Sequence, residues 1–271
     1  MLRKRLKKCA VGVACLLLLV MAAWAAENSL FPALDGTEQY TGGNVVIDAS
    51  HKDQGYFMAA YTGGGSKRLK LRTTKDGKTY TFDLNGEGEY EVFPLQMGDG
   101  AYQIEVFRQV KGNSYSSEFS QRIDVALQQE NLPFLYPNQY VWYEPEGDIV
   151  ALSDQLCGAL ETDAEKVAAV EDYIAQNMTY DFDKTRTVQS GYLPDVEEII
   201  DSNTGICFDL SAVVASLLRL QSIPTRLIVG YADGYYHAWN EILVDDEWQR
   251  YDGTAVVTNS SMKAYVEDQR Y

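Results

Sequence analysis

Residues 207–231, CFDLSAVVASLLRLQSIPTRLIVGY, change from a helical pattern to a strand pattern within one stretch. Apolar residues recur every three or four positions in the first part, which predicts the buried face of a helix that starts near Cys207: Leu210, Val213, Val214, Leu217 and Leu218. After Pro224 the aliphatic and β-branched residues of 225–231 favour a strand. The stretch therefore predicts a helix that leads directly into a sheet.

The surrounding residues extend both patterns. Downstream, 237–244 and 247–251 predict two strands that pair across Asp245-Asp246. Upstream, apolar residues at helical spacing follow position 148, Thr162 and Glu165 form a capping-box signal, and 194–200 predicts a short helix opened by Pro194. Helices followed by an antiparallel sheet are typical of an α+β domain, which we expect over residues 148–271.

Before this domain, the spacing of apolar residues changes from a helical to a strand pattern. Residues 78–84, 89–93 and 102–107 alternate polar and apolar side chains between turn-forming segments, which predicts short antiparallel strands. We expect a small β-sandwich domain over 27–126, with an immunoglobulin-like topology as the first interpretation. Residues 127–147 combine three prolines with several aromatics, which predicts an ordered linker packed on the following domain.

Residues 1–26 have the pattern of an export signal. Five lysines and arginines in the first nine residues precede an apolar run that ends in small residues. A cleaved signal peptide and an uncleaved N-terminal membrane anchor are both consistent with this segment. In either case we expect a secreted or cell-surface protein, in contact with a membrane only if the segment is retained.

The composition excludes some classes of partner. The chain has 39 acidic and 23 basic residues, a net charge of −16, which argues against a nucleic-acid partner. Its acidic residues lack the spacing of a calcium loop, and its few Cys and His residues lack paired zinc-ligand spacings. We therefore expect no metal and no organic cofactor.

Three residues in the last quarter of the chain could form a catalytic site: Cys207, His237 and Asp252. The nucleophile in cysteine chemistry is the thiolate, which a helix N-terminus stabilises through its unpaired N–H groups and dipole. An imidazole is the usual partner of such a thiol, and a carboxylate can orient the imidazole. The other histidine, His51, lies near a turn and is assigned no role.

Each of these residues also has a structural explanation. Cys207 could be a buried helix residue or could pair with Cys157 in a disulfide, which export permits. His237 could be an ordinary strand histidine beside Trp239, and Asp252 could simply precede a Gly253 turn.

The sequence from about Tyr180 to Thr254 resembles the bacterial transglutaminase-like domain of the papain-like superfamily. The matching segments are Gly205–Asp209, Leu217–Arg219, Ile223–Arg226, Val229–Tyr231, His237–Glu241 and Trp248–Thr254, with Gly253 where the family often has proline. The resemblance implies that Cys207 is the nucleophile, His237 the base and Asp252 its orienting partner. Family members cross-link glutamine to amines, cleave peptide or related amide bonds, or have lost activity.

From these observations we predict an exported cysteine acyl-transfer enzyme that acts on a carboxamide or peptide bond through a thioester. Its substrate is a protein or peptide, with cell-wall peptides as one class. The alternatives are a cysteine peptidase or amidase acting on cell-wall peptides and a catalytically silent surface binding module. Aromatics near His237 are candidates for the walls of the substrate cleft, namely Tyr231, Tyr235, Tyr236 and Trp239, and the oxyanion candidates are Asn203 and Gln189.

Overall fold

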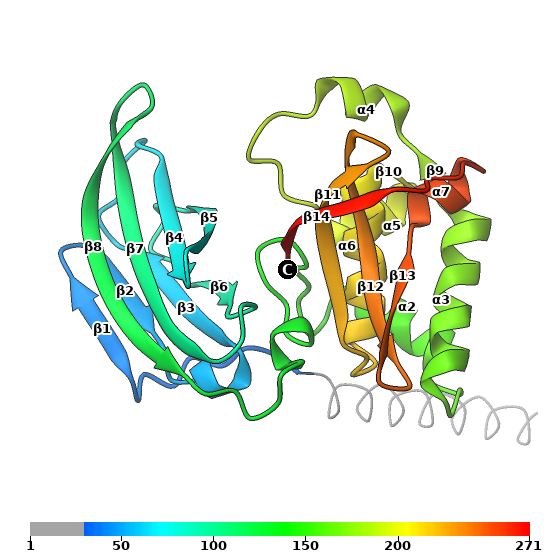
Figure 1. Ribbon diagram of the computed structural model, residues 1–271, viewed down its shortest axis with the longest axis horizontal. Helices are drawn as coiled ribbons and strands as arrows, with labels where there is room; N and C mark the ends of the chain where they lie inside the picture. The colour runs from blue at the N-terminus through cyan, green and yellow to red at the C-terminus, as the bar shows by residue number, and fades with distance from the viewer. Residues whose placement is uncertain (1–29) are drawn as a thin grey trace, which may run out of the picture.

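A computed structural model describes residues 30–271 of the chain (Figure 1). The predicted export signal, residues 1–26, lies outside the described residues. Within 30–271, no helix is both long and apolar enough to cross a membrane.

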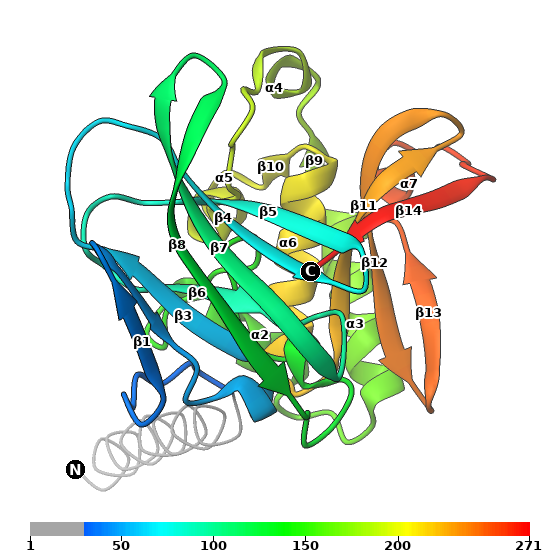
Figure 2. The same cartoon turned by 60° about the vertical axis from the view of Figure 1, so that its left-hand side comes forward.

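The N-terminal half consists of two four-stranded antiparallel sheets (Figures 1 and 2). The first has the order β1-β2-β3-β6 and the second β5-β4-β7-β8. Their bounds are β1 Gln39–Gly42, β2 Val45–Asp48, β3 Tyr56–Tyr61, β4 Leu69–Lys75, β5 Lys78–Leu84, β6 Glu91–Pro94, β7 Gly100–Lys111 and β8 Ser114–Val125. The sheets share a core in which the Phe82 and Phe93 ring centroids are 5.2 Å apart. The immunoglobulin-like topology and the domain boundaries stay predictions.

The C-terminal half packs helices on one four-stranded antiparallel sheet, which confirms the predicted α+β class. The helices are α2 Asp148–Cys157, α3 Asp163–Asn177, α4 Phe182–Thr187, α5 Val196–Ser202, α6 Cys207–Arg219 and α7 Gly253–Val257. The sheet has the order β13-β12-β11-β14, from β11 Thr225–Ala232, β12 Tyr235–Val244, β13 Glu247–Tyr251 and β14 Tyr265–Arg270. A short parallel pair joins β9 Thr179–Tyr180 to β10 Thr204–Gly205.

Helix α6 is the centre of this half, and it packs against β11 and β12 (Figure 1). Its apolar residues are buried on almost every side, so the predicted stripe was too narrow. Asn240 of β12 fixes the helix to the sheet, because its Nδ2 donates to the carbonyls of Ser211 at 2.9 Å and Arg226 at 3.2 Å. This attachment holds the first turns of α6 against the middle of β12.

Several elements differ from the predictions. The short helix after Pro194 begins at Val196, because the Asp195 side chain accepts the backbone N–H groups of Glu197 and Glu198. Proline therefore precedes the cap instead of opening the helix. Helices α4 and α7 have only six and five residues, too few for a periodic pattern, and the sequence analysis missed both. It also missed the mostly polar strand β14.

The connector contacts both halves of the molecule, whereas the sequence predicted contact with the following domain only. The ring of Tyr140 lies 5.9 Å from that of Phe82 and 4.3 Å from that of Tyr271. Gln139 donates from its amide nitrogen to the carbonyl of Asp83 at 2.6 Å. The aromatic side chains of 127–147 thus fill the space between the two halves.

Candidate active site

Cys207 is the first residue of α6, where the backbone N–H groups have no partner within the helix. The chain reaches this position through Gly205, which packs tightly on Asp209, since a Cβ at 205 would lie 2.6 Å from the Asp209 Cβ. Asp209 Oδ2 accepts the N–H of Ile206 at 2.9 Å, which caps the start of the helix. The thiol is therefore held at a helix N-terminus.

His237 and Asp252 meet through the β12–β13 hairpin. Asp245 and Asp246 both have positive φ, at 52° and 62°, which suits the tight turn that the sequence predicted. The resulting register pairs Asn240 with Tyr251, so Asp252 follows the end of β13 close to His237. The two atoms His237 Nε2 and Asp252 Oδ2 are 2.8 Å apart, and both side chains are buried.

The electrostatics of His237 favour the imidazolium. Burial disfavours the charged ring, but its hydrogen bonds to Asp252 and Cys207 outweigh that cost and raise the pKa of His237 to about 9. Because Asp252 occupies Nε2, the nitrogen left for Cys207 is Nδ1. The structure therefore brings all three predicted catalytic residues together.

Asp252 is held as a carboxylate by three donors. His237 Nε2 and the Tyr265 hydroxyl both lie 2.8 Å from Oδ2, and the Ala255 N–H lies 3.0 Å from Oδ1. Burial acts to raise the pKa of Asp252, but these hydrogen bonds keep it below its ordinary value. Tyr265 was missed because it comes from β14, thirteen residues further along the chain and outside the resembling stretch.

The four aromatic candidates divide into two groups. Tyr231, Tyr235 and Tyr236 are 47 %, 75 % and 70 % exposed on the β11–β12 hairpin. Burial is the main cause that raises the pKa of Tyr236, and Asp268 contributes. Trp239 is only 2 % exposed, so its assignment as a cleft wall is wrong. Its ring instead stacks on that of His237, with centroids 6.3 Å apart, and supports the imidazole from within the core.

Neither predicted oxyanion donor hydrogen-bonds to Cys207 within residues 30–271. Asn203 ends α5 with a φ of 52°, and its side-chain oxygen accepts from the Tyr173 hydroxyl at 3.5 Å. Gln189 is exposed and donates to the carbonyl of Thr187 at 2.7 Å, which directs its amide into its own loop. The oxyanion roles of Asn203 and Gln189 stay predictions.

Tyr180 is a neighbour of Cys207 that was not among the predicted site residues. It pairs with Gly205 in the β9–β10 ladder, which places it beside the start of α6. Burial raises the pKa of Tyr180, Cys207 is among the neighbours that affect this pKa, and the Tyr180 hydroxyl accepts a hydrogen bond from Thr185 Oγ1 at 3.1 Å. No sequence pattern marked this residue, because the two-residue ladder that positions it is too short to predict.

A second missed group surrounds Asp209. Its side chain is completely buried, with Lys184 Nζ 2.7 Å from Oδ2 and the Tyr192 hydroxyl 2.7 Å from Oδ1. Lys184 belongs to α4 and Tyr192 to the loop that follows it. Helix α4 is thus tied to the first turn of α6, directly below Cys207.

Cys157 and Cys207 are both free thiols in this structure, so the disulfide alternative does not hold. Cys157 is buried at the end of α2, and its thiol lies 3.7 Å from the carbonyl of Lys166. Burial raises the pKa of Cys157 to about 11, which keeps it protonated at neutral pH.

Comparison with known proteins confirms the resemblance. Residues 150–253 match the family model of the transglutaminase-like superfamily, and this range includes Cys207, His237 and Asp252. The uncharacterized protein YebA of Bacillus subtilis is 23 % identical over 257 residues, which cover 86 % of this chain and 33 % of YebA. The chain therefore spans about a third of the length of that relative.

Two solved structures are similar to the chain at low identity. A protein from Cytophaga hutchinsonii, provisionally assigned as a cysteine protease, is 18 % identical with a TM-score of 0.44, covering 80 % of this chain and 83 % of its own. The periplasmic domain of TgpA from Pseudomonas aeruginosa is 15 % identical with a TM-score of 0.38, covering 84 % and 77 % respectively.

Proposed function

We propose that the transglutaminase-like segment, residues 150–253, is the catalytic part of a cysteine acyl-transfer enzyme. Cys207 is the nucleophile, His237 the general acid and base, and Asp252 the residue that orients His237. The substrate is a protein or peptide that presents a carboxamide or peptide carbonyl. The basic and apolar residues of 1–26 support placing this reaction outside the cytoplasm.

The observation that carries this proposal is the position of His237 between a carboxylate and a thiol. Asp252 lies 2.8 Å from Nε2, and the remaining ring nitrogen faces Cys207. Because the pKa of His237 is raised to about 9, the ring is protonated at neutral pH and can give a proton to a leaving amine. A buried strand histidine that is only structural would not require both a carboxylate and a thiol as partners.

The reaction has two halves. The Cys207 thiolate attacks the carbonyl carbon, a C–S bond forms, and the C–N bond then breaks as His237 gives its proton to the departing ammonia or amine. This leaves the acyl group on Cys207 as a thioester. A second amine or a water then attacks the thioester, His237 takes the proton of that nucleophile, and the thiolate is released.

Two groups support the oxyanion of each tetrahedral intermediate. The N–H of Cys207 lies at the helix N-terminus, and Tyr180 lies beside the start of α6 through its pairing with Gly205. Donors aimed at a developing oxyanion typically contribute about 10²–10³ in rate each. The exposed tyrosines Tyr231, Tyr235 and Tyr236 lie on the same hairpin as His237 and would give an acyl donor an aromatic surface to contact.

The first experiment measures transfer itself. We expect the wild-type chain to incorporate a fluorescent primary amine into a glutamine-containing peptide and Cys207→Ala to lose all turnover while keeping its thermal unfolding midpoint. Cys157→Ala is the matched control and should retain activity, since Cys157 is buried away from the site. Turnover by Cys207→Ala would end the proposal. Peptide hydrolysis without amine incorporation would select the peptidase or amidase alternative.

A second measurement needs no substrate. Iodoacetamide at neutral pH should label Cys207 and spare Cys157, and His237→Ala should slow that labelling at least tenfold. Mass spectrometry of the intact protein and of its peptides identifies the labelled thiol. Equal labelling rates in wild type and His237→Ala would show that the pair does not activate the thiol and would favour a silent binding module.

A further inference from the structure

Three exposed apolar side chains form a row across three neighbouring strands of the C-terminal sheet. Val266 of β14 pairs with Tyr231 of β11, and Tyr231 pairs with Tyr236 of β12. Residues directly opposite each other in antiparallel strands point to the same face, so the three side chains lie side by side. The rings of Tyr231 and Tyr236 meet edge to face, with centroids 5.8 Å apart. We call these three residues the apolar row.

The apolar row lies on the face of the sheet that α6 covers. Successive strand residues alternate between the two faces, so Tyr236, Ala238 and Asn240 share one face. Asn240 donates to the carbonyl of Ser211 on α6, which identifies that face. Ala238 is only 3 % exposed there, whereas Tyr236, the next residue along the same face, is 70 % exposed. The cover of the sheet therefore ends at Ala238 and leaves the row open.

Helix α6 runs along β12 with its first turn toward the row. Arg219, the last residue of α6, donates to the carbonyl of Thr225, and Thr225 pairs with Ile242 near the far end of β12. The start of the helix therefore points toward Tyr236. Figures 1 and 2 both show the β11–β12 hairpin projecting beyond the start of α6.

The open part of this face begins beside Cys207. Cys207 precedes Ser211 by four residues, which correspond to about 6 Å of helix. The same length along β12 corresponds to about two residues from Asn240, which is the position of Ala238. Cys207 is thus level with Ala238, and Tyr236 at the end of the row comes next.

A second exposed apolar side chain flanks the same helix start. Phe182 is the first residue of α4, and most of its side chain is exposed. The N–H of Asp181 donates to the carbonyl of Gly205 at 2.9 Å, which fixes Phe182 next to the segment that enters α6. The Phe182 ring meets that of Tyr180 edge to face, with centroids 5.0 Å apart. Exposed apolar groups that gather in one place are typical of binding sites.

The fold holds Phe182 in this position before any ligand arrives. Lys184, in the same helix, lies 2.7 Å from the buried carboxylate of Asp209. The Asp181 side chain caps α4 by accepting the N–H groups of Asp183 and Lys184. A ligand that covers Phe182 would therefore bury apolar surface without the cost of ordering α4.

We propose that the apolar row and Phe182 bind a large apolar side chain of the acyl donor, within about two residues of the carbonyl that Cys207 attacks. The row spans two strand spacings, about 10 Å, which is the length of about three extended residues. Because the row begins beside Cys207, a donor that lies across it presents its carbonyl to the thiol. This inference rests on the function proposed for Cys207 and names its substrate class, a protein segment with a large apolar residue next to the reactive amide.

Charge and size select against cell-wall peptides as donors. Such peptides, built of alanine, glutamate and a diamino acid, carry an acidic residue and no large apolar side chain. The carboxylate of Asp268 is exposed two residues after Val266 in β14 and repels an acidic donor. The protein-segment class is therefore favoured over the cell-wall class.

The binding test uses the full-length chain with Cys207→Ala, so that it does not depend on turnover. Calorimetric titration compares acetyl-Gly-Leu-Gln-Leu-Gly-amide, the same peptide with serine in place of both leucines, and a cell-wall tripeptide of alanine, glutamate and diaminopimelate. We expect the leucine peptide to bind about tenfold more tightly than either of the others, because it alone buries large apolar side chains.

Two valines provide a matched pair of substitutions in the same background. Val266 in the row is 62 % exposed, and Val110 near the end of β7 is 58 % exposed. Val266→Thr keeps the shape of the side chain but adds a hydroxyl, and it should weaken leucine-peptide binding about threefold. Val110→Thr should leave the affinity unchanged. Phe182→Ser should weaken it about fivefold, and thermal unfolding of each variant checks folding.

Turnover separates this inference from the reaction on which it rests. If wild type transfers the leucine and serine peptides with equal kcat/KM, the substrate class is wrong and the chemistry of Cys207 stands. A leucine preference in binding with no turnover of either peptide supports the site and counts against the reaction.

Three binding results would also overturn the site. They are a cell-wall tripeptide that binds as tightly as the leucine peptide, a Val110→Thr variant that loses as much affinity as Val266→Thr, and a leucine peptide that does not bind at millimolar concentration.

Discussion

Among single residues, Asp252 contributes most to the geometry of the proposed site. It accepts hydrogen bonds from three parts of the chain. Its two oxygens receive the imidazole of His237, the hydroxyl of Tyr265 and the N–H of Ala255. The same carboxylate caps α7, so its position is fixed by local backbone structure as well as by the triad. A carboxylate held in this way orients the imidazole without needing to move during the reaction.

The Tyr265 hydroxyl should therefore affect how the alkylation rate of Cys207 depends on pH at acidic pH. The pKa of Asp252 is lowered in the folded protein, so the stabilisation by its ionised form is present above the ordinary pKa of 3.8 and is lost as the pH falls through the folded value. Tyr265→Phe removes one donor to the ionised form. We expect the acid limb of Cys207 alkylation to move to higher pH, with a rate about three- to tenfold lower on that limb.

The measurement is the alkylation rate of Cys207 from pH 4 to 8 in wild type and Tyr265→Phe. Tyr231→Phe is the matched control, since Tyr231 is exposed on the hairpin and does not contact Asp252. An unchanged acid limb in Tyr265→Phe would show that His237 and Ala255 alone hold the carboxylate.

At the scale of elements, helix α4 controls the start of α6 through one buried contact. Lys184 lies 2.7 Å from Asp209, whose carboxylate is completely buried in the first turn below Cys207. Removing the cation would leave that carboxylate with only the Tyr192 hydroxyl and the Ile206 N–H. Removal of one partner from a buried pair costs about 3–5 kcal/mol, and partial exposure of Lys184 reduces this.

We accordingly expect Lys184→Met to lower the free energy of unfolding by about 1–3 kcal/mol and to slow alkylation of Cys207. Arg186→Met in the same helix is the control. Arg186 pairs with Asp183, but both side chains are largely exposed, so its loss should change stability by less than about 0.5 kcal/mol. Urea unfolding of both variants compares them directly. Equal effects would mean that the Lys184–Asp209 pair has no special role.

At the scale of the whole molecule, Arg219 joins three distant segments. It ends α6, is completely buried, and donates to the carbonyls of Tyr136 in the connector, Thr225 at the start of β11 and Tyr271 after β14. Burial lowers its pKa to about 10, which still leaves it charged at neutral pH. Tyr271 in turn packs its ring against Tyr80 of β5 and Tyr140 of the connector.

Arg219→Met should destabilise the chain by about 2–4 kcal/mol, because the buried carbonyls of Tyr136 and Thr225 lose the Arg219 donor, while Tyr271 keeps the N–H of Leu227. Arg219→Lys keeps the charge but lacks the planar guanidinium and its several N–H donors. We therefore expect it to restore less than half of the free energy of unfolding that Arg219→Met loses. The measurement is the urea midpoint of each variant at neutral pH. A midpoint for Arg219→Met equal to that of wild type would show that these carbonyls find other donors.

Local sequence determined much of this protein. The helical stripe after Cys207, the capping box at Thr162 and the Asp245-Asp246 turn each depend on residues a few positions apart, so periodicity and turn chemistry predicted them. The residue types at 207, 237 and 252 predicted a cysteine site because the chain has so few cysteines and histidines. Register then brought His237 and Asp252 together through a hairpin that the sequence also predicted.

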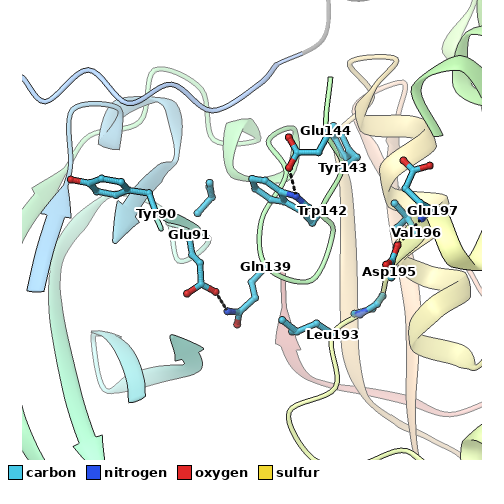
Figure 3. A pocket seen from close by; sticks show the side chains of 12 residues that line it. Tyr90, Glu91, Gln139, Trp142, Tyr143, Glu144, Leu193, Asp195, Val196 and Glu197 are labelled. Atoms are coloured by element: carbon cyan, nitrogen blue, oxygen red, sulfur yellow. Dashed lines mark hydrogen bonds between the residues drawn. The ribbon is translucent and has the colours of Figure 1, made fainter. Parts of the chain in front are cut away.

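Only the tertiary structure decided the contacts between distant segments. Trp239 is buried beside His237, Tyr180 pairs with Gly205 at the start of α6, Lys184 reaches Asp209, and a cavity forms where β6, the connector and the α5 loop meet (Figure 3). These contacts depend on how elements pack and on side-chain direction, and no local period records either. The sequence therefore determined which elements form and which chemistry the chain can support, whereas packing decided which residues surround that chemistry.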